Sequence, residues 1–225
     1  MNWQAIALSL KLAASVSAIL LALGLPIAYW MTFSRWRWKF LVEAVVALPL
    51  VLPPTVLGYY ILVGLGPRTL PGRMWESLFG QTLPFTFGGL LVASVLYSLP
   101  FAVQPFSAAF AAVDRRLVEA AWTLGGSGPR TFLSVIVPLS TAGILSGVVL
   151  SFAHTIGEFG VVLMVGGNIP GVTRTISIDI YDQVQAGNNA GANRTALVLL
   201  VFSFLVLSAI YGINRKVWNL WRQPQ

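Results

Sequence analysis

Long apolar runs limit what this sequence can fold into more than any other feature. A helix needs about 20 apolar residues to cross the ~30 Å hydrocarbon core of a membrane, and several runs of that length occur here. Only 9% of the residues are Asp, Glu, Lys or Arg, whereas soluble domains carry about 25%. The folded surface must therefore face lipid, which excludes a soluble enzyme or a disordered chain and argues against a nucleic-acid-binding protein.

Five such runs predict five membrane-spanning helices in an all-α bundle that forms one domain over residues 1–225. They cover residues 6–31, 41–65, 88–113, 136–165 and 196–213. Residues 166–193 differ because they mix Gly, Asn, Pro and two Asp with one short apolar segment, residues 176–184. That segment is either a surface helix or half of a sixth, discontinuous crossing, because polar backbone at membrane depth must be satisfied by protein or water.

The distribution of Lys and Arg predicts the orientation in the membrane, since short loops rich in these residues stay in the cytoplasm. Nine of the 14 basic residues fall on one side and four on the other. The richer side holds Arg35, Arg37, Lys39, Arg115, Arg116, Arg130, Arg215, Lys216 and Arg222. Amphipathic rings, which are favoured at membrane boundaries, occur on that side at Trp30, Trp36, Trp38, Trp218 and Trp221. The N-terminus is therefore expected outside and the C-terminus in the cytoplasm.

The loop between the third and fourth spans, residues 114–135, has the pattern of a short helix, a glycine turn and a second helix. Asp114 can cap the first helix, and apolar residues recur after it at helical spacing. Gly125 suits a left-handed helix end, and Pro129 suits the first turn of the next helix. On physical grounds alone the loop is either a capped surface helix that joins two spans or a docking site for a partner.

The same loop resembles the EAA loop of ABC importer permeases, in which Glu-Ala-Ala is followed after three residues by Gly and later by Ile, any residue and Leu-Pro. Glu119, Ala120 and Ala121 match the first part and Gly125 matches the glycine, whereas Val replaces both the later Ile and the Leu. The resemblance implies that these four residues belong to a coupling helix. Such a helix sits in a cleft of a separate ATP-binding cassette subunit and transmits nucleotide-driven motion to the spans.

The chain itself lacks the usual means of binding ATP. A nucleotide-binding P-loop needs Gly-Lys followed by Ser or Thr, but Lys11, Lys39 and Lys216 are followed by Leu, Phe and Val. With no cysteine and one histidine, no metal site is expected either. We therefore expect no cofactor in this chain, and the resemblance implies that ATP and magnesium are bound by the partner ATPase.

Two further segments are similar to the permeases of molybdate importers. One is residues 48–62, which begin Leu-Pro-Leu-Val-Leu-Pro-Pro, and the other is Gly-Glu-Phe-Gly at 157–160, continued by Gly-Asn-Ile-Pro-Gly within 167–175. Sulfate permeases have similar segments, so sulfate and tungstate are alternatives to molybdate. The resemblance implies a type I ABC importer permease fold, a homodimer, two cytoplasmic ATP-binding subunits, an extracytoplasmic molybdate-binding protein and a bacterial inner membrane.

These segments also supply candidates for a gate in the pathway. Pro53 and Pro54 lack the N–H that a helix requires and predict a kink or break in the second span; alternatively, they mark a rigid bend held by neighbouring spans. In the fourth span, Gly157 and Gly160 flank Glu158, a carboxylate inside an apolar stretch and thus a functional candidate. An ionised Glu repels anions, so Glu158 is interpreted as a gate or packing element and not as an oxyanion ligand.

A transient oxyanion path should offer hydroxyls, amides and N–H groups without a tight clamp of charges, since a transporter must release what it admits. The candidates are Ser151, Thr155, Asn168, Thr173 and Thr175, with Arg174 as an external attractor. Each of them could equally cap a turn or satisfy the helix backbone.

An ion-coupled secondary transporter is the second hypothesis. His154 and Glu158 are four residues apart in sequence and would share one face of a helix, as a proton relay needs. This hypothesis leaves the Glu-Ala-Ala loop unexplained. Copurification of an ATP-binding subunit would distinguish the two hypotheses, because an ion-coupled carrier needs none.

Overall fold

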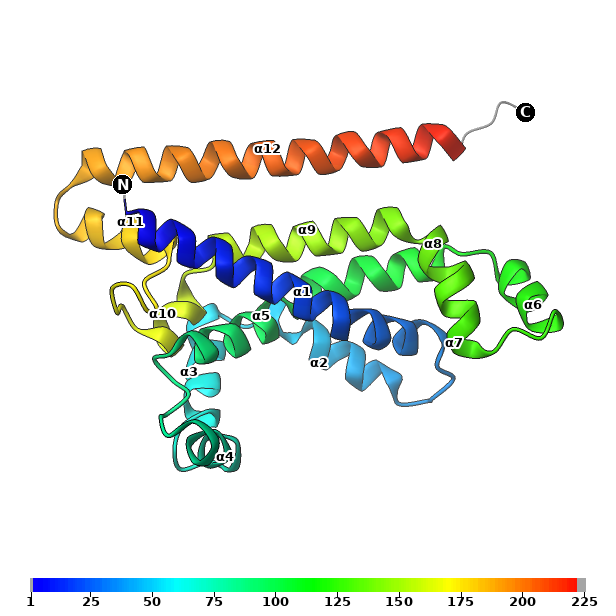
Figure 1. Cartoon of the computed structure of the whole chain (residues 1–225), viewed down its shortest axis with the longest axis horizontal. Coiled ribbons are helices and arrows are strands. Elements are labelled where there is room, and N and C mark those ends of the chain that lie inside the picture. The colour runs from blue at the N-terminus through cyan, green and yellow to red at the C-terminus, as the bar shows by residue number, and fades with distance from the viewer. Residues whose placement is uncertain (1, 222–225) are drawn as a thin grey trace.

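The structure is built of helices, and the longest of them run along a common direction (Figure 1). It is a computed structural model that describes residues 2–221, with side chains described as far as Gly212 except for residue 210. No strand occurs among these residues, so the predicted all-α class is confirmed. The helices are α1 (Trp3–Phe33), α2 (Lys39–Val51), α3 (Pro54–Gly64), α4 (Leu70–Phe79), α5 (Phe87–Ala111), α6 (Arg115–Thr123), α7 (Gly128–Thr131), the π-helix η1 (Phe132–Ile136), α8 (Val137–Leu139), α9 (Thr141–Gly157), α10 (Gly160–Gly166), α11 (Ile176–Gln185) and α12 (Asn189–Trp221).

The core forms where α1, α5 and α9 pack against one another. Leu12 and Leu20 of α1 and Phe106 and Phe110 of α5 are fully buried there. Gly147 of α9 lies so close to α5 that a Cβ atom on it would be 2.5 Å from Cε1 of Phe106. Small residues allow helices to approach closely in a membrane, where such packing drives helix association.

The described residues offer three to five membrane crossings, and the upper number is the one predicted. α1, α5 and α12 through Ala209 are long and apolar enough to span a membrane on their own. Two bent pairs, α2 with α3 and the segment from α7 to α8 with α9, supply two more crossings when each pair counts as one span. α1 and α12 both begin at the end of the bundle that lies opposite α6 (Figure 1).

The predicted second span, residues 41–65, is broken rather than continuous. α2 ends at Val51, and α3 starts at Pro54 at an angle of 116° to α2. Leu52 and Pro53 between them are extended, with ψ of 137° and 135°. Proline cannot donate a helical hydrogen bond, and a residue before proline favours extended backbone. The break predicted at the two prolines is confirmed, and α3 lies across the direction of the long helices (Figure 1).

The predicted fourth span, residues 136–165, is interrupted at two places. The segment that ends with α8 meets α9 at 78° beside Ser140, shortly after Pro138, whose ring removes a helical donor. α9 then ends at Gly157, because Glu158 is extended with φ −66° and ψ 134°. The continuous helix of this crossing therefore has 17 residues, and α10 is a separate short helix.

Residues 166–193, all of which are described, hold no helix long enough for a sixth crossing. α11 has 10 residues, about 15 Å at 1.5 Å per residue, and it lies at the end of the bundle opposite α6 (Figure 1). The predicted last span, residues 196–213, lies within the longer helix α12. The orientation prediction also used residues that lie outside the described side chains, namely Arg215, Lys216, Trp218, Trp221 and Arg222.

Candidate functional site

The predicted coupling helix is α6, and its two ends follow the local sequence signals. The Asp114 carboxylate accepts a hydrogen bond from the Arg116 N–H at 2.9 Å and so caps the first turn. At the other end Gly125 has φ of +82°. The N–H groups of Gly125 and of the residue after it donate to the carbonyls of Trp122 and Ala121. These two bonds form the Schellman motif, which closes a helix on a left-handed residue.

Most of α6 is exposed, at the end of the bundle opposite the start of α1 (Figure 1). Val118 anchors the helix by burial against the rest of the fold. Glu119 and Ala120 are exposed and Ala121 is half-buried. Further exposed apolar side chains on or beside the helix are Leu117, Trp122 and Leu124. The exposed surface of this helix therefore combines apolar side chains with the acidic group of Glu119 and the basic groups of Arg115 and Arg116.

Two of the predicted gate segments meet at a joint between α3 and α10. A Cβ atom on Gly160 would lie 2.7 Å from Cβ of Pro54, and one on Gly58 would lie 2.8 Å from Cβ of Met164. Each of the two helices therefore has a glycine where the other packs against it. Such contacts leave little room for a side chain at either position.

A cavity of about 590 Å³ opens beside this joint. Its lining includes Pro54, Thr55, Tyr97, His154, Gly157, Glu158 and Gly160. The structure thus brings together four of the five predicted gate residues, while Pro53 precedes them in the chain without lining the cavity. Thr55 and Tyr97 are not among the residues predicted from the sequence. A hydroxyl inside an otherwise apolar span is the signal that could have found Tyr97.

Glu158 lies at the break between α9 and α10 and is almost fully buried. Ser94 of α5 faces its carboxyl group, yet neither carboxyl oxygen makes a hydrogen bond of ordinary geometry among the described residues. A buried polar group without a partner is costly, and an ionisable residue within a membrane is a functional candidate. The break in the helix and the unpaired carboxyl group therefore occur at the same residue.

The predicted pairing of His154 with Glu158 on one helix face is wrong, because α9 ends before Glu158. His154 instead contacts α5. Its Nδ1 atom is 2.9 Å from Oγ of Ser98, and the same Oγ is 3.0 Å from Oγ1 of Thr155. The imidazole ring also stacks on Phe101, with the ring centroids 3.8 Å apart. These contacts hold His154 between the core and the cavity.

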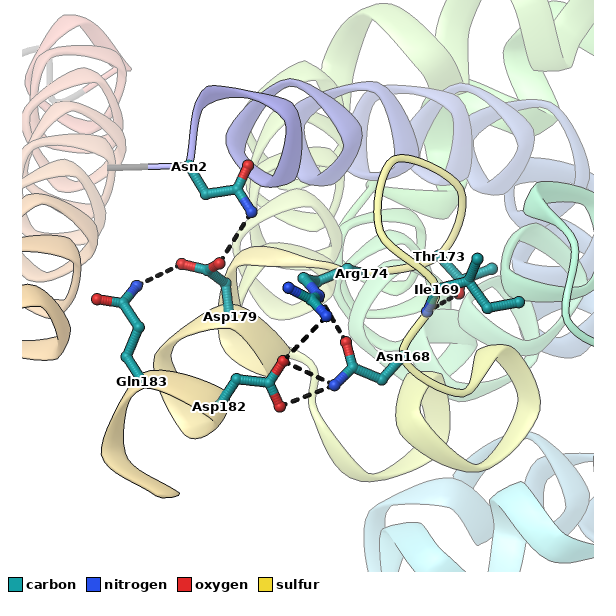
Figure 2. A network of polar contacts seen from close by, with 8 residues as sticks. All are labelled: Asn2, Asn168, Ile169, Thr173, Arg174, Asp179, Asp182 and Gln183. Carbon is teal, nitrogen blue, oxygen red and sulfur yellow. Dashed lines mark hydrogen bonds and ion pairs between the residues drawn. The ribbon is translucent and has the colours of Figure 1, made fainter. Parts of the chain in front are cut away.

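Polar contacts fasten the loop between α10 and α11 onto α11 (Figure 2). The Asn168 side-chain N–H groups donate to both carboxylate oxygens of Asp182, each at 2.7 Å, and its carbonyl oxygen accepts from Nε of Arg174 at 2.7 Å. Arg174 also pairs with Asp182, with 3.4 Å between Nη2 and Oδ2. Nearby, Asn2 at the start of α1 donates to Asp179 of α11 at 2.9 Å. Arg174, the predicted external attractor, is therefore already paired with an acid.

The five predicted oxyanion contacts are not brought together, and none of them lines the cavity beside α3 and α10. Ser151, Thr155 and Thr173 are buried, and their hydroxyls donate to backbone carbonyls. Thr175 is buried, and its hydroxyl has no partner among the described residues. Asn168 is exposed but held by the polar contacts described above. In this conformation most of these groups support the fold, and their contact with a solute stays a prediction.

Comparison with known proteins places this architecture among transport proteins. Residues 21–219 match the family of binding-protein-dependent transport system inner membrane components. The molybdenum transport system permease protein ModB of Azotobacter vinelandii is 52% identical over 94% of this chain and 93% of its own. The protein of the same name from Escherichia coli strain K12 is 37% identical, covering 96% of both chains.

A solved structure shares the fold at low sequence identity. A chain of the MetNI methionine ABC transporter, in an inward-facing conformation, superimposes with a TM-score of 0.74. The two chains are 17% identical, and the match covers 96% of each. The arrangement of broken and continuous spans is thus the one used by type I ABC importers.

Proposed function

The chain belongs to the family of binding-protein-dependent transport system inner membrane components, and on that premise we propose that it forms the membrane pathway of an ATP-driven importer of molybdate. Members of this family are subunits of transport systems that span the inner membrane several times, and they are not enzymes. Membership also decides against the ion-coupled carrier, since such a carrier needs neither a binding protein nor an ATPase. Molybdate is the proposed solute because both relatives described above, which match nearly the full chain, are named as molybdenum permeases.

The exposed surface of α6 is the observation that carries the coupling role. It combines three exposed apolar side chains with one acid, Glu119, and two basic residues in the first turn, Arg115 and Arg116. A water-exposed helix that keeps such side chains uncovered is suited to a protein partner. The Schellman motif at Gly125 fixes where the helix ends and so fixes the direction in which this surface points. We assign α6 to docking on a cytoplasmic ATP-binding subunit, which holds ATP and magnesium.

The remaining partners follow from this assignment. One chain carries one α6, and an importer with two ATP-binding subunits needs two such helices, so the proposed assembly contains a homodimer of this chain. An extracytoplasmic molybdate-binding protein would deliver the solute to the end of the bundle where α1 and α12 begin. With α6 in the cytoplasm, the N-terminus lies outside and the C-terminus inside, as the basic residues predict.

The joint between α3 and α10 is the proposed gate. Its cavity lies beside the two breaks at Pro53 and Glu158, where the backbone leaves helical geometry. Rigid helices that end on both sides of a tight contact can move as units about it. Glu158 contributes to this gate as a buried group whose carboxyl oxygens have no hydrogen-bond partner among the described residues and would gain one when the helices move, and not as a ligand of the oxyanion.

The test is uptake by the complete complex. The chain is reconstituted in liposomes with its ATP-binding subunit and its binding protein, and uptake of labelled molybdate, tungstate and sulfate is measured with ATP and with a non-hydrolysable analogue. Molybdate uptake that requires ATP hydrolysis and exceeds sulfate uptake is expected. Preferential sulfate uptake would overturn the solute, and uptake driven by an ion gradient without ATP would overturn the importer.

A further inference from the structure

A hydrogen-bonded series of one backbone carbonyl, two hydroxyls and one imidazole fixes which nitrogen of His154 carries a proton. The first link is Thr155, whose Oγ1 lies 2.8 Å from the backbone carbonyl oxygen of Ser151. A carbonyl oxygen can only accept, and a hydroxyl has one proton to donate. The proton of Thr155 is therefore used in this bond.

The second and third links follow by elimination. Ser98 and Thr155 share a hydrogen bond of 3.0 Å between their hydroxyl oxygens, and Ser98 must be the donor because Thr155 has no proton left. Ser98 in turn lies 2.9 Å from Nδ1 of His154. Since the Ser98 proton is also used, Nδ1 of His154 has to donate. A neutral imidazole has one N–H, so its Nε2 atom then carries only a lone pair.

Nε2, the unprotonated nitrogen of His154, belongs to a side chain that lines the cavity. His154 is half-buried and forms part of the cavity wall, and Nε2 has no hydrogen-bond partner among the described residues. Stacking on Phe101 holds the plane of the ring, and Tyr97 packs beside it with the ring centroids 4.7 Å apart. Neither Lys nor Arg is among the residues that line the cavity.

We propose that these hydrogen bonds make His154 a specificity-determining residue. Its ring presents an acceptor nitrogen to the cavity. The cavity therefore takes water or other hydrogen-bond donors and does not retain an oxyanion. An oxyanion also brings only acceptor atoms, so it gains nothing from Nε2 and is repelled by the neighbouring Glu158 when that group is ionised. With Glu158 ionised, the hydroxyls of Thr55 and Tyr97 are the only side-chain donors that the described residues direct at the wall of this cavity. The consequence for transport, which rests on the proposed function, is that the solute passes the gate without being trapped.

The sequence offers a direct measurement, because His154 is the only histidine among the 225 residues. The chain is labelled with [15N]histidine, purified without a histidine tag and assembled with unlabelled ATP-binding subunits in lipid nanodiscs. Nitrogen chemical shifts at neutral pH then report the tautomer of this one ring. A ring protonated on Nδ1 is expected, and a ring protonated on Nε2 overturns the proposal.

Three variants test whether the two hydroxyls set the tautomer. Ser98→Ala removes the group that accepts from Nδ1, and the ring is expected to shift towards the form protonated on Nε2. Ser94→Ala is the matched control, because Ser94 is an equally buried serine one turn away on α5 that lies outside the hydrogen-bonded series. Thr155→Ser keeps every link and should also preserve the tautomer. If the His154 ring in the Ser98→Ala variant stays wholly protonated on Nδ1, the hydrogen bonds through Ser98 do not set the tautomer, and the proposal is overturned.

The same samples test the exclusion of the oxyanion. Molybdate added in excess should leave the ring signals of the unsubstituted chain in place, and it should shift them in Ser98→Ala, where Nε2–H offers a donor. A shift in the unsubstituted chain overturns the exclusion. The nitrogen chemical shifts report the tautomer whether or not the protein transports molybdate. If the His154 ring is protonated on Nδ1 but the complex takes up no molybdate, the proposed function is refuted and the inference about His154 stands.

Discussion

Gly160 lies so close to Pro54 that a Cβ atom on the glycine would be 2.7 Å from Cβ of the proline. This contact joins α10 to α3, two short helices that each begin at a break in a membrane span. Gly157, which lies on the other side of Glu158, has open space around the corresponding position. An added Cβ atom would therefore be crowded at Gly160 and unhindered at Gly157, so the same substitution at the two positions isolates the effect of the contact.

Replacing Gly160 by Ala should loosen the joint between α3 and α10. The added methyl group overpacks a tight contact, for which the expected loss of stability is about 1–3 kcal/mol. Thermal unfolding in detergent should therefore occur at a lower temperature than for the unsubstituted chain. Gly157→Ala is the control and should leave the unfolding temperature nearly unchanged. Equal effects of both substitutions would contradict the packing argument.

Replacing Glu119 by Ala should uncouple ATP hydrolysis from uptake. The side chain is exposed on α6 and contributes nothing to the fold that the structure shows, so the amount of protein in the membrane should not change. Uptake should fall at least several-fold while ATP hydrolysis by the assembled complex continues. Glu76→Ala is a suitable control, since Glu76 is an exposed acid on α4, outside the coupling helix. Normal uptake by the Glu119 variant would refute the coupling role.

The coupling helix shows what the sequence can predict well. Asp114, Gly125 and Pro129 act within a few residues of their own positions, and the structure has the cap, the left-handed helix end and the proline in the first turn of the next helix where they were predicted. The break at Pro53 and Pro54 was predictable for the same reason, because the missing N–H is a property of the residue itself. Local chemistry therefore fixed both features.

The joint and the cavity show what the sequence could not predict. The contact of Pro54 with Gly160 connects two parts of the chain that are far apart in sequence, so it depends on how α1, α5 and α9 pack first. The spacing of His154 and Glu158 predicts a shared helix face, but the helix ends at Gly157 because Glu158 is extended, and no proline near this position indicates the end. The partner of His154, Ser98, lies on another helix and leaves no pattern in the sequence.

Replacing Gly147 by Ala should prevent normal packing of α9 on α5. The new Cβ atom would lie 2.5 Å from Cε1 of Phe106 and 2.9 Å from the backbone carbonyl oxygen of Ala102, and the backbone atom cannot swing aside. We expect a loss of several kcal/mol of stability, at or above the upper end of the range for overpacking, about 3 kcal/mol. The measurement is the yield of monodisperse protein after extraction in detergent. Gly212→Ala on α12, where a Cβ atom meets open space, should extract normally.

Replacing Asn168 by Asp should release the loop between α10 and α11. The amide donates to both carboxylate oxygens of Asp182, and a second carboxylate in its place would repel Asp182. Hydrogen bonds to charged groups contribute about 1.5–3 kcal/mol, so Asn168→Asp, which keeps an acceptor for Arg174 but loses both donors to Asp182, should loosen the loop. Limited proteolysis of the loop measures the effect. Cleavage as slow as in the unsubstituted chain would show that the two bonds to Asp182 do not hold the loop.

The break between α2 and α3 has a consequence for hydration. In an uninterrupted helix the carbonyl oxygens of Pro49 and Leu50 would accept from residues 53 and 54, but both of these are proline and have no N–H. An unsatisfied carbonyl in hydrocarbon costs several kcal/mol, so water must reach these oxygens or another polar group must cover them. Water bound to these carbonyl oxygens within the membrane shortens the stretch over which a solute would have no contact with water. A permeating oxyanion then keeps more of its solvation shell, and the energy barrier set by its dehydration falls.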